Sequence, residues 1–207
     1  MKFEDMKINC HSSICLDGNI YIDPFNVQDS LNNAKVVFIT HPHFDHLDVP
    51  SIRKVSNDKT IFVCTKDSAE KLSTFENEKI IVKPNEEGKA NGVEFSTFPA
   101  YNFGHHHFKE YGWVGYIIKI NGVSYTICGD TDRTPELESV KTDVLFVPIG
   151  GTYTMDAKEA GKLVNIIKPS LAIPTHYNYI SGTCGREGER EFKAVVDKKI
   201  PIKILVK

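Results

Sequence analysis

The sequence lacks the paired cysteines of a disulfide framework or of a cysteine-rich zinc module. Its five cysteines form no CxxC pair: they are Cys10, Cys15, Cys64, Cys128 and Cys184. An odd, scattered set of this kind is typical of reduced thiols in a cytoplasm. We therefore expect a cytoplasmic protein without cross-links, in which any metal site uses other ligands.

Long apolar stretches and an excess of either charge are also missing. No run approaches the roughly eighteen apolar residues of a membrane-spanning helix, and residues 1–5 do not resemble a signal peptide. The chain has 25 Lys and Arg against 27 Asp and Glu, a formal net charge of -2. This balance creates no overall field that would attract nucleic acid or anionic lipid. We expect no membrane partner, and the composition disfavours a nucleic-acid partner.

What the sequence does have is a series of short apolar runs separated by turn residues. Their Val, Ile, Leu and Phe content is continuous rather than alternating, which indicates strands covered on both faces, as in a layered α/β protein. Asn121-Gly122 joins two of these runs and favours a tight antiparallel hairpin. The length of 207 residues fits one domain, 1–207. The predicted strands cover 36–39, 60–63, 80–82, 93–98, 114–120, 123–128, 144–147, 171–173 and 202–206.

Helices are predicted between these runs. Asp156 can cap a helix whose apolar residues recur at helical spacing through Ile167, before Pro169 ends it. Further helices are predicted over 187–198, 49–55 and 67–75. The polar segment 83–91, which contains Pro84 and Gly88, is predicted to be a surface loop.

Three imidazoles and a carboxylate are concentrated directly after the first predicted strand. The residues are His41, His43, Asp45 and His46. Pro42 cannot donate a hydrogen bond in a central strand, so these residues lie in a loop at the carboxyl end of that strand. Open α/β sheets keep their functional sites at such ends. Mixed nitrogen and oxygen donors without cysteine favour a reactive metal site over a structural zinc site.

Two later strand ends repeat this arrangement. The run that ends at Cys128 is followed by Gly129-Asp130-Thr131-Asp132, and the run that begins at Leu171 is followed by Thr175-His176. An Asp after Gly is by itself more often a turn residue than a ligand. Three strands that deliver Asp or His at their carboxyl ends, however, can assemble one site from distant segments.

These motifs resemble the metallo-β-lactamase superfamily, in particular its branch similar to L-ascorbate-6-phosphate lactonase. The resemblance is carried by HxHxDH at 41–46, by the turn 129–132 and by Pro174-Thr175-His176, and Ile22-Asp23-Pro24-Phe25 and the loop 148–156 extend it. It implies a four-layered αβ/βα sandwich with a metal pocket along one edge, where loops from both halves meet.

The resemblance also implies a ligand set for one or two divalent ions. His41 and His43 would hold a first ion, Asp45, His46 and His176 a second, and Asp130 would bridge the two. Many relatives place a further His shortly after the strand that corresponds to 93–98. Here that position is filled either by Asn102 or by a residue of the triplet 105–107, of which we favour His107. His11 resembles a residue near the pocket, and Asp132 is placed to orient a ligating imidazole.

The chemistry that follows is hydrolysis by a metal-bound hydroxide, with Asp45 as the catalytic residue that orients it. A phosphodiester, a lactone or another ester of a small molecule fits this chemistry. Zinc is favoured as the metal, and manganese, iron and nickel accept the same donors. The sequence leaves the oligomeric state open, including a homo-oligomer.

Two alternatives remain. A metal-dependent binding or regulatory module would keep these ligands without turnover. A di-iron redox protein on the same fold is disfavoured, because such relatives usually carry a carboxylate where this chain has His43.

Overall fold

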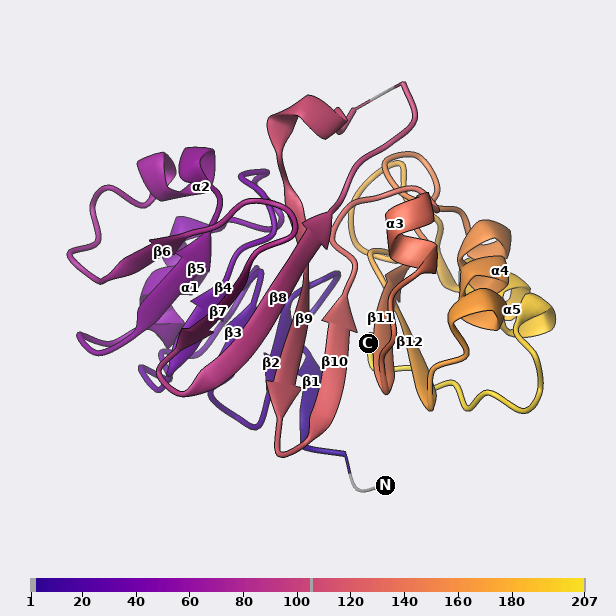
Figure 1. The fold of residues 1–207 in the computed structure, drawn as a ribbon, viewed down its shortest axis with the longest axis horizontal. Helices are drawn as coiled ribbons and strands as arrows, with labels where there is room; N and C mark the ends of the chain where they lie inside the picture. The colour runs from indigo at the N-terminus through magenta and orange to yellow at the C-terminus, as the bar shows by residue number, and fades with distance from the viewer. Residues whose placement is uncertain (1–2, 105, 207) are drawn as a thin grey trace.

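The computed structural model of the chain describes residues 3–104 and 106–206. It contains two six-stranded sheets with helices on their outer sides, which confirms the predicted αβ/βα sandwich (Figure 1). The strand orders are β1-β2-β3-β4-β5-β6 and β12-β11-β10-β9-β8-β7.

The first sheet begins with two antiparallel pairings, β1 with β2 and β2 with β3, and continues through β6 with parallel ones. Its strands are β1 (Met6–Ile8), β2 (Ile14–Leu16), β3 (Ile20–Ile22), β4 (Val36–Phe38), β5 (Ile61–Cys64) and β6 (Lys79–Ile81).

In the second sheet, β7 to β10 pair antiparallel, whereas β10, β11 and β12 run parallel. The hairpin between β9 and β10 turns at Asn121 and Gly122, both with positive φ, as the Asn-Gly dipeptide predicts. The strands are β7 (Glu87–Ala90), β8 (Val93–Pro99), β9 (Val114–Ile120), β10 (Val123–Ile127), β11 (Val144–Pro148) and β12 (Leu171–Thr175).

The helices cover the outer faces of the two sheets. Ile52 and Val55 of α1 (Val49–Val55) pack with Val37 and Phe62 of the first sheet. Beyond the second sheet, the Asp156 carboxylate caps α4 (Ala157–Ile167) by accepting the N–H of Glu159 at 2.7 Å. The other helices are α2 (Lys66–Lys71), α3 (Pro135–Glu138), α5 (Arg186–Val195) and the 3-10 turn Lys109–Tyr111.

The space between the sheets is filled by large side chains from both. The ring of Phe38 lies 5.5 Å from that of Phe95 and 5.0 Å from that of Tyr116, measured between centroids. All three rings are buried. This packing fixes the two sheets against each other, so the loops at their common edge have defined relative positions.

Several predicted elements need correction. The segment 83–91 is not only a loop, because Glu87–Ala90 forms the edge strand β7. Residues 202–206 do not form a strand, since only Ile202 makes a bridge, to Ala172. The helices predicted over 187–198 and 67–75 end earlier, at Val195 and Lys71.

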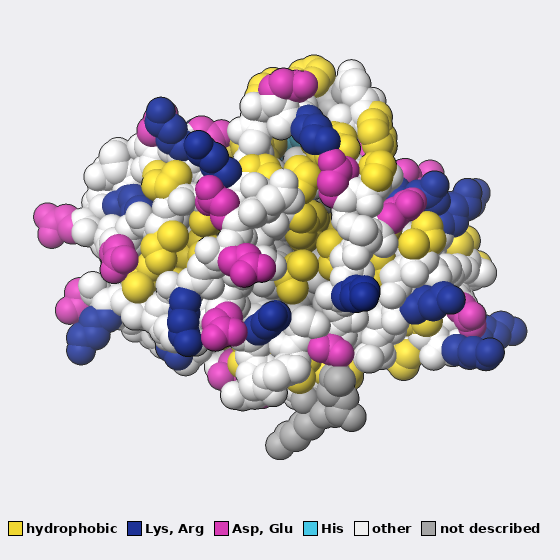
Figure 2. All heavy atoms as spheres, in the orientation of Figure 1, with side chains coloured by type: hydrophobic (Ala, Val, Ile, Leu, Met, Phe, Trp, Pro, Cys, Tyr) yellow, Lys and Arg dark blue, Asp and Glu magenta, His cyan; other side chains and the backbone are white. Residues whose placement is uncertain are grey.

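The surface carries Lys, Arg, Asp and Glu interspersed over the face shown in Figure 2, in keeping with the small net charge. Within the described residues, none of the helices has the length and apolar content needed to cross a membrane.

Candidate metal centre

The loop between β4 and α1 presents four of the predicted site residues at the carboxyl edge of the first sheet. His41, Asp45 and His46 are buried, and His43 is half-buried. The carbonyl of His43 accepts the N–H groups of His46 and Leu47 at 3.0 and 2.7 Å. These turn hydrogen bonds fold the loop back on itself, so that imidazoles close in sequence point into one space.

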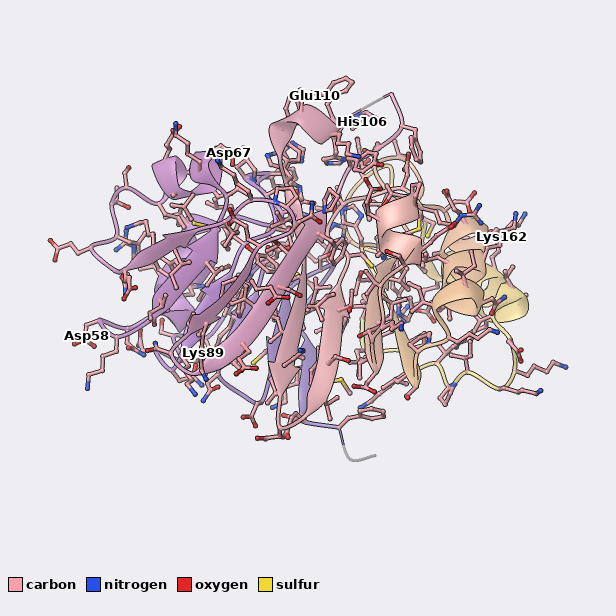
Figure 3. The ribbon with its side chains drawn as sticks, viewed as in Figure 1. Asp58, Asp67, Lys89, His106, Glu110 and Lys162 are labelled. Carbon is pink, nitrogen blue, oxygen red and sulfur yellow. The ribbon has the colours of Figure 1, made fainter. Side chains whose placement is uncertain are left out.

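Other strand ends and loops bring further donors to the same place. Asp130 follows β10, His176 follows β12, and His107 lies in the long loop between β8 and β9, next to His106 (Figures 1 and 3). His11 comes from the turn between β1 and β2, and its carbonyl accepts the N–H of His176 at 3.2 Å. All seven residues predicted as metal ligands are therefore brought together, and His11 joins them.

The donors form two groups, within each of which the ligand atoms lie within 4.8 Å of one another. The groups are His41, His43, His107 and Asp130, and His11, Asp45, His46 and His176. Asp130 also reaches the second group: its Oδ1 lies 3.1 Å from His46 Nε2 and its Oδ2 3.0 Å from His176 Nε2. This position between the groups is what a bridging ligand requires.

Several of these donor atoms are buried without a hydrogen-bond partner in the described part of the chain. They are Nε2 of His41, His46 and His176, and Oδ1 of Asp130. Some of these atoms lie close to one another, but not in hydrogen-bond geometry. Buried polar atoms are costly when unsatisfied. Nitrogen and oxygen donors in this number fit zinc, manganese, iron or nickel, so the residues present fit a divalent ion.

The charges of the cluster are strongly coupled. Burial alone would raise the pKa of Asp45 and of Asp130, but the surrounding imidazoles hold both pKa values below the usual range. Burial would lower the pKa of His46 and His176, but the Asp130 carboxylate raises both. In contrast, burial lowers the pKa of His11 and of His107 to about 4. These two imidazoles are neutral at neutral pH, the form that binds metal.

Asp23 is a site residue that the sequence analysis did not identify. It is fully buried, and its Oδ2 lies 2.8 Å from Nδ1 of His46. The same carboxylate accepts the N–H and the hydroxyl of Thr40 at 2.8 and 2.7 Å. A carboxylate behind a ligating imidazole fixes its orientation and tautomer. The signal in the sequence was the segment Ile22-Asp23-Pro24-Phe25, which extends the family resemblance although its strand β3 is too short to be predicted.

Asn102 and His107 do not compete for one position. The Nδ1 of His107 is hydrogen-bonded to Oδ1 of Asn102, and the Nε2 of His107 lies 3.3 Å from Nδ1 of His43. Asn102 in turn donates to Oδ1 of Asp132 at 2.9 Å. His107 thus joins the cluster with Asn102 behind it, and Asp132 acts on the imidazole through Asn102. His105, the first residue of the triplet, lies outside the described residues.

A cavity of about 340 Å³ opens onto these donors. His43, Asp45, His107, Asp130 and His176 contribute to its lining, and the rest of the lining comes from Phe44, His106, Tyr153 and Ile180. A substrate in this cavity would therefore contact both groups of donors. A larger groove, of about 680 Å³, lies along β1 to β3 and contains none of the eight clustered residues.

Comparisons with known proteins agree with this geometry. A family model described as a beta-lactamase superfamily domain matches residues 8–176. A Pyrococcus furiosus protein named as a metal-dependent hydrolase is 31% identical over 214 residues, covering 94% of this chain and 93% of its own length. A crystal structure of a metal-dependent hydrolase from Parabacteroides distasonis superposes with a TM-score of 0.79 at 25% identity, covering 98% of this chain and 93% of that one.

The same fold also carries other chemistry. CmlA from Streptomyces venezuelae, a diiron β-hydroxylase, matches with a TM-score of 0.73 at 12% identity, and the match covers 100% of this chain and 53% of CmlA. That likeness concerns the fold alone, so the choice of chemistry depends on the donors in the site. With the family model covering most of the chain and the buried His and Asp cluster at its expected edge, the chain belongs to the metallo-β-lactamase superfamily, among its metal-dependent hydrolases.

Proposed function

We propose that the protein cleaves a phosphodiester, a lactone or another ester of a small molecule, with water as the nucleophile and one or two divalent ions as cofactor. The observation that carries this proposal is the cluster of His and Asp donors at the floor of an open cavity, several of whose buried atoms have no hydrogen-bond partner among the described residues. Membership of the superfamily is consistent with it.

The donors divide naturally between two ions. His41, His43 and His107 would hold the first, and Asp45, His46 and His176 the second, with Asp130 between them. His11 is close enough to contribute to the second, because its Nε2 lies 3.2 Å from Oδ2 of Asp45. Divalent ions bound there would supply an acidified water molecule and an electrophile for the substrate oxygen.

Asp45 is the residue we assign to orienting the water. It lines the cavity, and its Oδ2 faces the imidazoles of His11, His46 and His176 at 3.2 to 3.6 Å. An ionised carboxylate only accepts hydrogen bonds, so it can hold a water molecule with one O–H toward itself and a lone pair toward the substrate.

The test combines metal analysis with turnover. Protein purified without chelator should contain bound metal and, loaded with Zn²⁺ or Mn²⁺, should hydrolyse members of a panel of nitrophenyl carboxylic esters, lactones and phosphodiesters. Asp130→Asn should lose metal and lower kcat/KM by at least about 100-fold. Asp58→Asn is the matched control, because Asp58 is an exposed carboxylate before β5, at the opposite edge of the sheet (Figure 3).

Two results would contradict the proposal. A filled site with no turnover of any class would favour the binding module, and an absorption spectrum of a redox-active di-iron centre in anaerobically purified protein would favour the oxidative alternative.

A further inference from the structure

We infer that the substrate is a carboxylic ester or lactone with an apolar aryl or alkyl group beside its carbonyl, rather than a phosphate ester. This inference rests on the proposed function and narrows it. In the reaction, water adds across the acyl–oxygen bond, and the products are a carboxylate, an alcohol and a proton.

The walls of the cavity are the first support. Above the His and Asp floor, the lining consists of Phe44, Tyr153, Ile180 and the exposed His106. Phe44 stands between His43 and Asp45 in the sequence and lines the cavity beside them, yet 67% of the residue is exposed. An exposed ring at the mouth of a cavity gains free energy when a ligand covers it.

Phe44 is part of a larger aromatic group from three segments. Its ring lies 6.1 Å from the ring of Phe25, which lies 5.6 Å from the ring of Tyr179, both in edge-on contacts. The Tyr179 hydroxyl accepts a hydrogen bond from the side-chain amide of Asn26, which fixes the position of the ring. We call Phe25, Phe44 and Tyr179 the aromatic rim. Of these three, Phe44 lines the cavity, and Phe25 packs against both Phe44 and Tyr179. Single exposed apolar residues are common on protein surfaces, but a series of packed rings that begins at a cavity indicates a binding surface.

The second support is charge. None of the described residues that line the cavity is Lys or Arg. Metal ions at the floor can hold the phosphoryl group that reacts, but a charged group that extends along the walls is usually held by Arg, Lys or helix N-termini. Lys71 lies close enough for its charge to act on His43, and its ammonium group donates a hydrogen bond to the Pro42 carbonyl at 2.7 Å. Lys109 forms an ion pair with Glu136 at 2.6 Å. Both cations are engaged outside the cavity lining, so the walls favour an uncharged, apolar group.

A chain-length series tests the inference by turnover. With zinc-loaded protein, kcat/KM for nitrophenyl hexanoate should exceed that for nitrophenyl acetate by at least about tenfold. Both values should exceed kcat/KM for bis-nitrophenyl phosphate. Phe44→Ala should reduce the ratio of kcat/KM for nitrophenyl hexanoate to that for nitrophenyl acetate by about threefold or more. Phe44→Leu should retain most of this ratio. Leu31→Ala should leave the ratio unchanged, because Leu31 is 52% exposed but lines the separate groove along β1 to β3.

A binding measurement separates failure of the inference from failure of the proposed function. Trp113 is the only tryptophan, and its ring lies 4.9 and 4.8 Å from those of His41 and His43. In zinc-loaded protein, its fluorescence should report that the free hexanoate anion binds at least about tenfold more tightly than the free acetate anion. Faster cleavage of bis-nitrophenyl phosphate than of nitrophenyl hexanoate, or a flat chain-length series, would overturn the inference. Tighter binding of hexanoate than of acetate, without cleavage of any ester, would support the apolar wall of the cavity and contradict the proposed hydrolysis.

Discussion

At the scale of single residues, Asp23 fixes the orientation of His46, one of the proposed metal ligands. Its carboxylate holds Nδ1 of His46 and is itself held by Thr40. We predict that Asp23→Asn weakens metal binding about 10- to 100-fold, because the amide removes the charge that keeps the imidazole basic and oriented. Competition with a chelating indicator measures this affinity.

The matched control is Asp143→Asn. Asp143 accepts the N–H and hydroxyl of Ser124 at 2.9 and 2.8 Å, as Asp23 does with Thr40, but at the start of β11. It should lower the free energy of unfolding without changing metal affinity. Equal metal affinities for the two variants would mean that Asp23 only supports the fold.

Single residues also show what sequence reasoning could and could not predict. The donors His41, Asp130 and His176 were predictable because each follows a strong apolar strand. The relation of Asn102 to His107 was not, because it depends on how the loop between β8 and β9 folds back through their hydrogen bond. No local pattern encodes a contact of that kind.

At the scale of elements, α4 and α5 approach closely through Gly161. A Cβ atom placed at Gly161 would lie 2.8 Å from Cβ of Val195. We predict that Gly161→Leu lowers the free energy of unfolding by about 1–3 kcal/mol, although leucine favours helix over glycine, because the helices must separate. Urea denaturation measures the change.

Lys162→Leu is the control for this prediction. It places the same side chain one residue further along α4, at an exposed position. It should be close to neutral, and both variants should keep their metal. A neutral Gly161→Leu would show that α5 adjusts without cost.

The elements differ in how predictable they were. The strands β4, β5 and β8 to β12 are apolar enough to be recognised from the sequence, whereas β1, β2 and β3 have three residues each and are broken by turns. The edge strand β7 has the sequence EGKA and exists because β8 pairs with it. Conversely, the apolar run 202–206 lies beside the edge strand β12 but makes only the bridge from Ile202 to Ala172. Tertiary pairing decided these cases.

At the scale of the whole molecule, the candidate metal centre is built from both halves of the sandwich. Four donors come from the loop after β4 in the first sheet, and Asp130, His107 and His176 come from the second. An ion bound by both sets stabilises the folded chain by mass action, because the unfolded chain does not keep these donors together. Stability should therefore depend on metal concentration.

We predict that removing metal with a chelator lowers the Tm by about 5–10 °C relative to protein with zinc at 100 times its Kd, the shift expected for about 2.7 kcal/mol in a chain of this size. Added Zn²⁺ should restore the Tm of the wild type and of Asp58→Asn, but not of His176→Ala. Differential scanning calorimetry measures the shift. A Tm that is the same with and without metal would mean that the folded chain binds the ion no more tightly than the unfolded chain does, and would contradict a metal centre assembled from both sheets.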